Sequence, residues 1–208
     1  MASDPLLRPG GREAWPGGPE PELIPPLVDD AAIAALTDIY RHTLPAGGAI
    51  LDLACGWMSH LPPEIAYARV VGIGDDACAL AENPFLDEWR VQDLNADPRL
   101  PFAAGAFDGA ALCAALPRLT RPIEVIREVG RVLKPGAPLV VTFSNRFPAG
   151  RGLACWHLLD DAGQLCLIVH YFAEAGNWTD IRCLHRTLPG GGDPLYAVAG
   201  RSLGPAPD

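Results

Sequence analysis

Two spacings of apolar residues alternate along this chain, and together they predict a sheet whose strands are connected by helices. Short apolar and β-branched runs are typical of strands, whereas apolar positions three and four residues apart are typical of helices. Seven strands are predicted, at residues 49–51, 69–73, 89–91, 107–113, 138–143, 180–185 and 195–198. Helices are predicted at residues 30–44, 76–82, 122–133 and, as one or two segments, 152–175.

The order of these elements predicts the fold class. Strands that alternate with helices form a doubly wound, mostly parallel α/β sheet, because parallel neighbours need a crossover connection. The last two strands are joined by the glycine-rich segment 189–193, which predicts a closing antiparallel hairpin. We therefore expect a seven-stranded, Rossmann-like sheet with an antiparallel edge.

Prolines, glycines and capping residues limit the predicted helices. Asp29 or Asp30 is the predicted N-cap of the first helix. Pro62 and Pro63 allow only a short helix between the first two strands, because proline breaks a helix interior. Gly163 is the predicted break within residues 152–175.

The N-terminal segment differs in composition from the rest of the chain. Residues 1–28 contain seven prolines and four glycines. A segment of this composition buries too little apolar surface to offset the conformational entropy that it would lose on folding. We expect residues 1–22 to form a flexible arm and residues 23–208 to form a single domain, with residues 23–28 as an extended strip on its surface.

Charge and cysteine usage exclude several kinds of partner. The formal charge of −9 would repel a phosphate backbone, so no nucleic-acid partner is expected. No apolar run reaches the ~20 residues of a membrane span, and we expect a cytoplasmic protein with reduced cysteines. The histidines show no metal-ligand spacing, so no metal site is predicted.

The segment Asp52-Leu53-Ala54-Cys55-Gly56 follows the first strand directly. It resembles the first motif of class I S-adenosylmethionine-dependent methyltransferases, Asp-Leu-Gly-Cys-Gly-x-Gly, with Ala54 and Met58 in place of the first and third glycines. The resemblance spans residues 49–143 and is densest in Leu100-Pro101-Phe102, Phe107-Asp108 and residues 126–136, which read almost as the type 11 branch of that family. It implies the strand order 3-2-1-4-5-7-6.

The resemblance also implies S-adenosylmethionine as cofactor, lying across the ends of the first four strands. Asp52 and Gly56 would meet its methionine end, and an acid ending the second strand would bind the ribose. That position is Gly74 here, so either Asp75 reaches back to the ribose or the acid is lost. Asp93 would meet the adenine amino group. Leu94 and Cys113 complete the predicted cofactor contacts.

No catalytic residue is assigned, because transfer of an activated methyl group needs mainly proximity and orientation. His60 is a candidate base or substrate contact, although a lone histidine beside Leu61 and Pro62 is often structural. The resemblance thus implies a methyltransferase acting on an unidentified small molecule.

Other interpretations remain open at the level of sequence. The changed motif would also suit a non-catalytic methyltransferase-like fold that binds a ligand or a partner protein. Asp52 could cap a turn, and Asp93 with Asn95 could form only an Asx turn. Residues 72–77 match the dinucleotide fingerprint G-x-G-x-x-A, but they follow the second strand, whereas that fingerprint belongs after the first.

Overall fold

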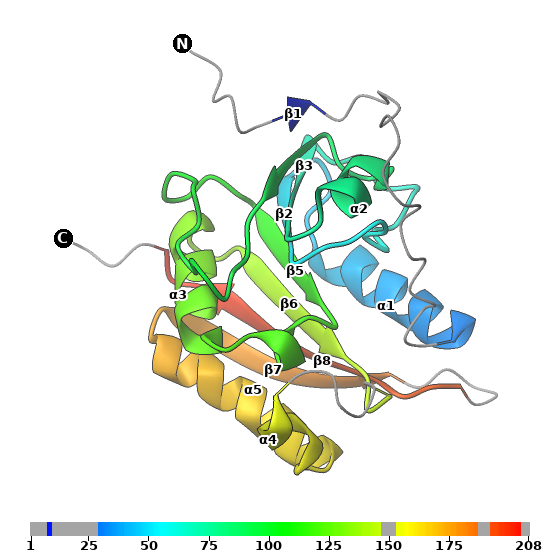
Figure 1. Ribbon diagram of the computed structural model, residues 1–208, viewed down its shortest axis with the longest axis vertical. Coiled ribbons are helices and arrows are strands. Elements are labelled where there is room, and N and C mark those ends of the chain that lie inside the picture. Colours follow the sequence, from blue (N-terminus) through cyan, green and yellow to red (C-terminus); the bar gives the residue numbers. More distant parts are fainter. Residues whose placement is uncertain (1–7, 10–28, 147–152, 187–191, 205–208) are drawn as a thin grey trace.

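One mixed sheet runs through the molecule, with helices covering both of its faces (Figure 1). The computed structural model describes residues 8–9, 29–146, 153–186 and 192–204. The strands lie in the order β1-β4-β3-β2-β5-β6-β8-β7. They are β1 Arg8–Pro9, β2 Ala49–Leu53, β3 Arg69–Gly74, β4 Glu88–Val91, β5 Gly109–Cys113, β6 Pro138–Phe143, β7 Trp178–Arg186 and β8 Leu195–Ser202.

The predicted fold class is confirmed. Strands β4, β3, β2, β5 and β6 are parallel neighbours, and β8 and β7 add the antiparallel edge. All seven predicted strands are present in the order that the resemblance implies. The two-residue strand β1, which the sequence did not predict, pairs antiparallel with β4 and makes an eighth.

The helices separate into two layers (Figure 1). They are α1 Asp30–Thr43, α2 Ala77–Glu82, α3 Pro122–Val132, α4 Ala154–His157 and α5 Asp161–Ala175, with the short 3₁₀ helix η1 Leu116–Arg118. On one face, α1 and α2 pack on the sheet in a cluster that includes Leu36 and Val140. On the other face, α3 and α5 pack in a cluster that includes Leu112 and Phe172.

Two predictions about helices were wrong. Residues 54–68 contain no helix, so the crossover from β2 to β3 is an irregular segment in which Ser59 and Leu61 are buried. The break before α5 lies at residues 158–160 and not at Gly163. Asp160 caps α5 by accepting the backbone N–H of Gly163 at 2.8 Å, which places this glycine in the first turn.

The predicted boundaries of the other elements are confirmed in some places and not in others. Asp29 caps α1, accepting the backbone N–H of Ala32 at 2.9 Å, as expected. The strand predicted over 107–113 begins only at Gly109. The predicted arm and the strip at 23–28 lie outside the described residues, apart from β1. Within the described part of the chain, no helix is both long and apolar enough to cross a membrane.

Candidate functional site

The carboxyl ends of β2, β3, β4 and β5 lie side by side, because these four strands are parallel neighbours. Ligands of doubly wound sheets bind outside these ends. Ala54 after β2 and Ala114 after β5 both take the left-handed conformation, with φ of 49° and 51°. These left-handed residues start turns that lead the chain away from the sheet at this edge.

Asp52 is the most deeply buried acid of this edge. It is 2% exposed on the α1 side of β2, and its Oδ2 has no hydrogen-bond partner among the described residues. Burial raises the pKa of this carboxyl to about 7, although the nearby Ser59 hydroxyl acts in the opposite direction. Asp52 therefore lies beneath the edge and is largely neutral in weakly acidic solution.

Hydrogen bonds from Asn83 hold the irregular segment that follows β2. Its side-chain Nδ2 donates to the carbonyl oxygen of Gly56 at 2.8 Å and to Ser59 Oγ at 3.0 Å. Its Oδ1 accepts the backbone N–H of Phe85 at 3.1 Å. A buried amide thus holds this segment where the sequence predicted a short helix.

The end of β3 explains why Gly74 is not an acid. A Cβ at this position would collide with the backbone carbonyl oxygen of Cys55, whose N–H donates to Ile73 at 2.9 Å. Asp76 is occupied as the N-cap of α2, accepting from Cys78 and Ala79. Asp75, the residue between them, is also exposed and is the carboxylate that follows position 74 directly.

Asp93 follows β4 and is exposed. Its Oδ1 accepts the backbone N–H of Asn95 at 2.8 Å, so it does form an Asx turn. This use of one carboxylate oxygen is compatible with a ligand contact through the other. The side chain of Leu94 is 4% exposed and packs into the core under the site, so its cofactor contact stays a prediction.

Cys113 and two residues that sequence reasoning missed make a buried polar group beside Asp52. Cys113 pairs in register with Thr142 on β6, and Tyr40 of α1 packs over them. Burial raises the pKa of the Cys113 thiol to about 11 and the pKa of Tyr40 well above its ordinary value. Tyr40 Oη and Thr142 Oγ1 have no hydrogen-bond partner in the described part of the chain.

No sequence signal marked these two side chains as part of a polar group. Thr142 lies within an apolar strand, and Tyr40 occupies an apolar helix position. Each is compatible with an ordinary core position when the chain is read alone.

His60 follows Ser59 at the end of the segment that Asn83 holds. Its backbone is left-handed, with φ of 55°, and its carbonyl oxygen accepts the Thr37 hydroxyl of α1 at 3.1 Å. Burial lowers the pKa of the imidazole, which keeps the ring neutral near pH 7. His60 is therefore anchored to α1 through its backbone, which leaves the ring to interact with other groups.

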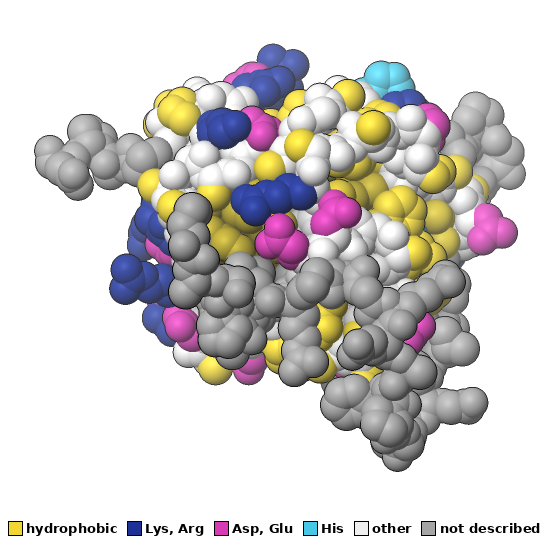
Figure 2. Space-filling view, turned by 90° about the horizontal axis from the view of Figure 1, so that it is seen from above, with side chains coloured by type: hydrophobic (Ala, Val, Ile, Leu, Met, Phe, Trp, Pro, Cys, Tyr) yellow, Lys and Arg dark blue, Asp and Glu magenta, His cyan; other side chains and the backbone are white. Residues whose placement is uncertain are grey.

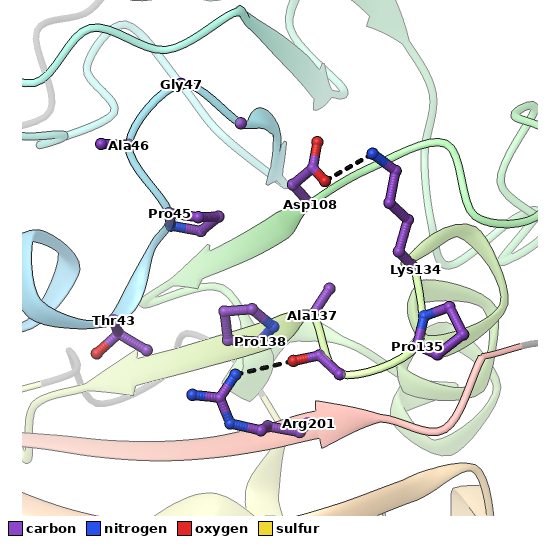
Figure 3. Close-up of a pocket in the computed structure, with 12 residues that line it drawn as sticks. Thr43, Pro45, Ala46, Gly47, Asp108, Lys134, Pro135, Ala137, Pro138 and Arg201 are labelled. Atoms are coloured by element: carbon purple, nitrogen blue, oxygen red, sulfur yellow. Dashed lines mark hydrogen bonds and ion pairs between the residues drawn. The ribbon is translucent and has the colours of Figure 1, made fainter.

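A separate groove of about 710 Å³ lies at the opposite edge, where β2, β5 and β6 begin (Figure 3). Lys134 reaches across it to Asp108 at 2.6 Å, and Arg201 donates to the carbonyl oxygen of Gly136 at 2.8 Å. None of the predicted cofactor residues lines this groove. Among the described residues, no group of His, Cys, Asp or Glu side chains could hold a metal ion.

Charged side chains of both signs share the face shown in Figure 2, where Lys and Arg lie beside Asp and Glu with apolar side chains between them. Ion pairs such as Arg69 with Glu88 and Arg41 with Asp38 show the same mixing at the level of contacts. Mixed charge of this kind does not form the basic surface that attracts a nucleic-acid backbone.

Comparison with known proteins shows which family this chain resembles. A family model described as "Methyltransferase domain" matches residues 51–141, which contain β2 to β6 almost completely. A ubiquinone biosynthesis O-methyltransferase of Xanthomonas axonopodis pv. citri is 30% identical over 121 residues, covering 53% of this chain and 48% of that protein. This chain therefore spans about half the length of the curated relatives it matches.

Two solved structures show the same fold. The crystal structure of the cyclase SpnF aligns with a TM-score of 0.59 and 20% identity, covering 81% of this chain and 80% of that one. Phosphoethanolamine N-methyltransferase 2 of Haemonchus contortus, solved in complex with S-adenosyl-L-methionine, aligns with a TM-score of 0.58 and 13% identity, covering 82% of this chain and 52% of that one.

Proposed function

We propose, from the premise that this chain is a member of the class I S-adenosylmethionine-dependent methyltransferase family, that it methylates a small-molecule acceptor. The observation that carries this proposal is the pair of exposed carboxylates, Asp75 and Asp93, at the ends of the neighbouring strands β3 and β4. Such carboxylates can accept hydrogen bonds from the hydroxyl and amino groups of an adenosine.

The residues of this edge fit the adenosine part of the cofactor. Asp75 would accept the ribose hydroxyls in place of the missing acid at position 74, and Asp93 would accept the adenine amino group. A Cβ at Gly56 would meet nothing within 4 Å, so a ligand can approach the backbone there. Asp52 would contribute from below, through the polar group that it forms with Ser59 and Asn83.

S-adenosylmethionine supplies an already activated methyl group, so the protein's contribution is orientation, desolvation and removal of a proton. His60 is the candidate for the last task. A neutral imidazole accepts a proton from an acceptor hydroxyl, and burial keeps His60 neutral near pH 7. The Thr37 contact holds the backbone of His60 on α1.

The Xanthomonas relatives are O-methyltransferases of ubiquinone biosynthesis by name, which makes a hydroxyl group the first acceptor class to test. The acidic composition and the mixed charge of the face shown in Figure 2 agree with a small acceptor and not with a nucleic acid. The noncatalytic binding module remains the alternative, and an assay of methyl transfer distinguishes it from an enzyme.

Calorimetric titration with S-adenosylhomocysteine tests the proposal. We expect binding in the high micromolar range, because position 74 lacks the acid that would accept charge-assisted hydrogen bonds worth ~1.5–3 kcal/mol, or roughly one to two decades in Kd. Asp93→Ala should raise Kd by about tenfold. Glu82→Ala, which removes an exposed acid from the far end of α2, is the matched control and should leave Kd unchanged.

Methyl transfer is then measured with a panel of small hydroxyl and amine acceptors. Binding of S-adenosylhomocysteine without transfer to any acceptor would favour the noncatalytic module. Absence of any binding at millimolar ligand would contradict the proposed function.

A further inference from the structure

The loop that carries Asp93 is tied to the loop after β5 by a single side chain, Asn95. Its Nδ2 donates to the carbonyl oxygen of Arg118 at 3.1 Å. Its Oδ1 accepts the backbone N–H of Thr120 at 2.7 Å and the Thr120 hydroxyl at 3.1 Å. Both the donor and the acceptor of the Asn95 amide thus bind residues more than twenty positions away in the sequence.

Asp93 and Asn95 are coupled directly. The Asp93 carboxylate accepts the backbone N–H of Asn95 at 2.8 Å, so the position of Asn95 sets the direction of that carboxylate. The next backbone bonds, from Ala96 and Asp97 to the Asp93 carbonyl oxygen, complete one turn with Asn95 inside it. Any displacement of Asn95 is therefore transmitted to Asp93.

The loop does not need Asn95 for its own shape. Gln92 closes it from within, because its Nε2 donates to the carbonyl oxygens of Asp97 at 2.8 Å and Arg99 at 2.9 Å. The contacts of Asn95 have a different role, which is to fix this closed loop against the segment 114–120 that follows β5. Both loops lie at the carboxyl edge, on either side of the ends of β2 and β3 in the sheet order.

We propose that Asn95 is a positioning residue for adenosine binding, which holds the Asp93 carboxylate at the edge by linking the two loops. This inference rests on the proposed function, since it concerns the same site. An adenine lying across these strand ends would contact both loops, so their relative position determines whether Asp93 meets the adenine amino group. Asn95 itself contacts no ligand in this arrangement and acts through Asp93.

The test is a double-mutant cycle read by calorimetric titration with S-adenosylhomocysteine. Asn95→Ala should raise Kd about tenfold, as Asp93→Ala does, because both remove the same ligand contact. In the Asp93→Ala background, Asn95→Ala should change Kd by less than about twofold. Thr120→Val removes the hydroxyl contact but keeps the backbone N–H that donates to Asn95, so it should raise Kd by less than Asn95→Ala does. Glu82→Ala, at the far end of α2, is the control and should leave Kd unchanged.

A merely structural role gives a different pattern. Asn95→Ala would then lower the melting temperature and raise Kd by the same factor whether or not Asp93 is present, which would overturn the proposal. Unchanged Kd in a folded Asn95→Ala variant would overturn it as well. Should this variant fail to fold, Asn95→Asp, which keeps the acceptor for Thr120, replaces it in the cycle.

Failure of the proposed function is distinguishable from failure of this inference. If the unaltered protein binds no S-adenosylhomocysteine, the proposed function and this inference are both contradicted. If it binds and Asp93→Ala weakens binding while Asn95→Ala does not, only the positioning role is contradicted.

Discussion

The carbonyl oxygen of Cys55 occupies the space that a side chain at position 74 would need. This contact exists because the segment after β2 crosses the end of β3, where the Cys55 N–H donates to Ile73 at 2.9 Å. The family resemblance alone suggests that Gly74→Asp would restore a ribose-binding acid and improve affinity. The structure contradicts that expectation, because a carboxylate at this position must displace backbone before it can contact a ligand.

Gly74→Ala therefore tests whether the segment after β2 crosses the end of β3 at Cys55. We expect it to lower the free energy of unfolding by about 1–3 kcal/mol, the usual cost of forcing extra atoms into a packed site. Gly56→Ala is the matched control, because a Cβ there meets nothing and the backbone is not left-handed, and its effect should stay within about 0.5 kcal/mol. Chemical denaturation of the two variants measures the difference. Equal stability of Gly74→Ala and wild type would contradict the described path of Cys55.

Asp52 should make stability fall as the pH rises. Burial raises its folded-state pKa from 3.8 to about 7, so between these values the unfolded chain loses the proton and the folded protein keeps it. Each unit of this difference is worth ~1.4 kcal/mol, which gives a loss of up to ~4 kcal/mol across the window. Denaturation at about pH 5 and about pH 7.5 measures the change.

Asp52→Asn is the comparison for that experiment, because it keeps the shape of the side chain and removes its titration. His60 contributes in the opposite direction, since burial lowers its pKa and its protonation destabilises the fold in acid. We therefore expect the difference in stability between Asp52→Asn and wild type to grow with pH. A constant difference across the window would show that Asp52 stays ionised.

Much of the fold follows from local pattern. The helix α3 begins at Pro122 and ends before Lys134 because a first-turn proline and a regular apolar stripe define it without tertiary help. The continuous apolar run of β6 is likewise sufficient to predict a central buried strand. In these two elements the local propensity of the residues and their packing in the fold favour the same structure, so sequence alone identifies them.

The site is harder to predict, because its geometry depends on contacts between distant residues. The two prolines at 62 and 63 indicated a short helix, but nothing local shows that Asn83 holds the segment in its place. Asp93 follows a strand, as the sequence predicts, yet its connection to Thr120 through Asn95 spans loops whose proximity only the assembled sheet creates. Residue types can therefore be predicted at this edge, whereas their mutual orientation cannot.

The N-terminal arm gives a prediction that the described residues leave open. Removal of residues 1–22 should preserve a cooperative melting transition, because the composition of this segment provides little apolar surface to bury. The deletion also removes β1, whose two residues pair with Trp89 and Glu88 at the exposed side of β4. We expect the melting temperature to change by less than about 4 °C, which corresponds to roughly 1 kcal/mol for a chain of this size. A larger decrease would show that the arm is docked.

Arg131 of α3 holds the segment that returns from the candidate site to β5. Its guanidinium donates to the carbonyl oxygens of Leu100 at 2.8 Å and Phe102 at 2.9 Å. Glu128 completes the arrangement, because it pairs with Arg131 and its Oε2 accepts the Leu100 N–H at 3.0 Å. One cation thus satisfies two loop carbonyls and a carboxylate, a geometry that the planar fork of arginine allows.

Arg131→Lys should therefore destabilise the protein although the charge is kept. A lysine ammonium cannot reproduce the planar fork, and a lost hydrogen bond to a charged group costs ~1.5–3 kcal/mol. We expect a decrease of about 2 kcal/mol in the free energy of unfolding, or roughly 4–8 °C in melting temperature. Arg121→Lys is the control, since its exposed partner Glu124 lies on the surface and such pairs are worth less than about 1 kcal/mol. If both variants melt at the same temperature as the wild type, the carbonyl contacts of Arg131 do not hold this segment.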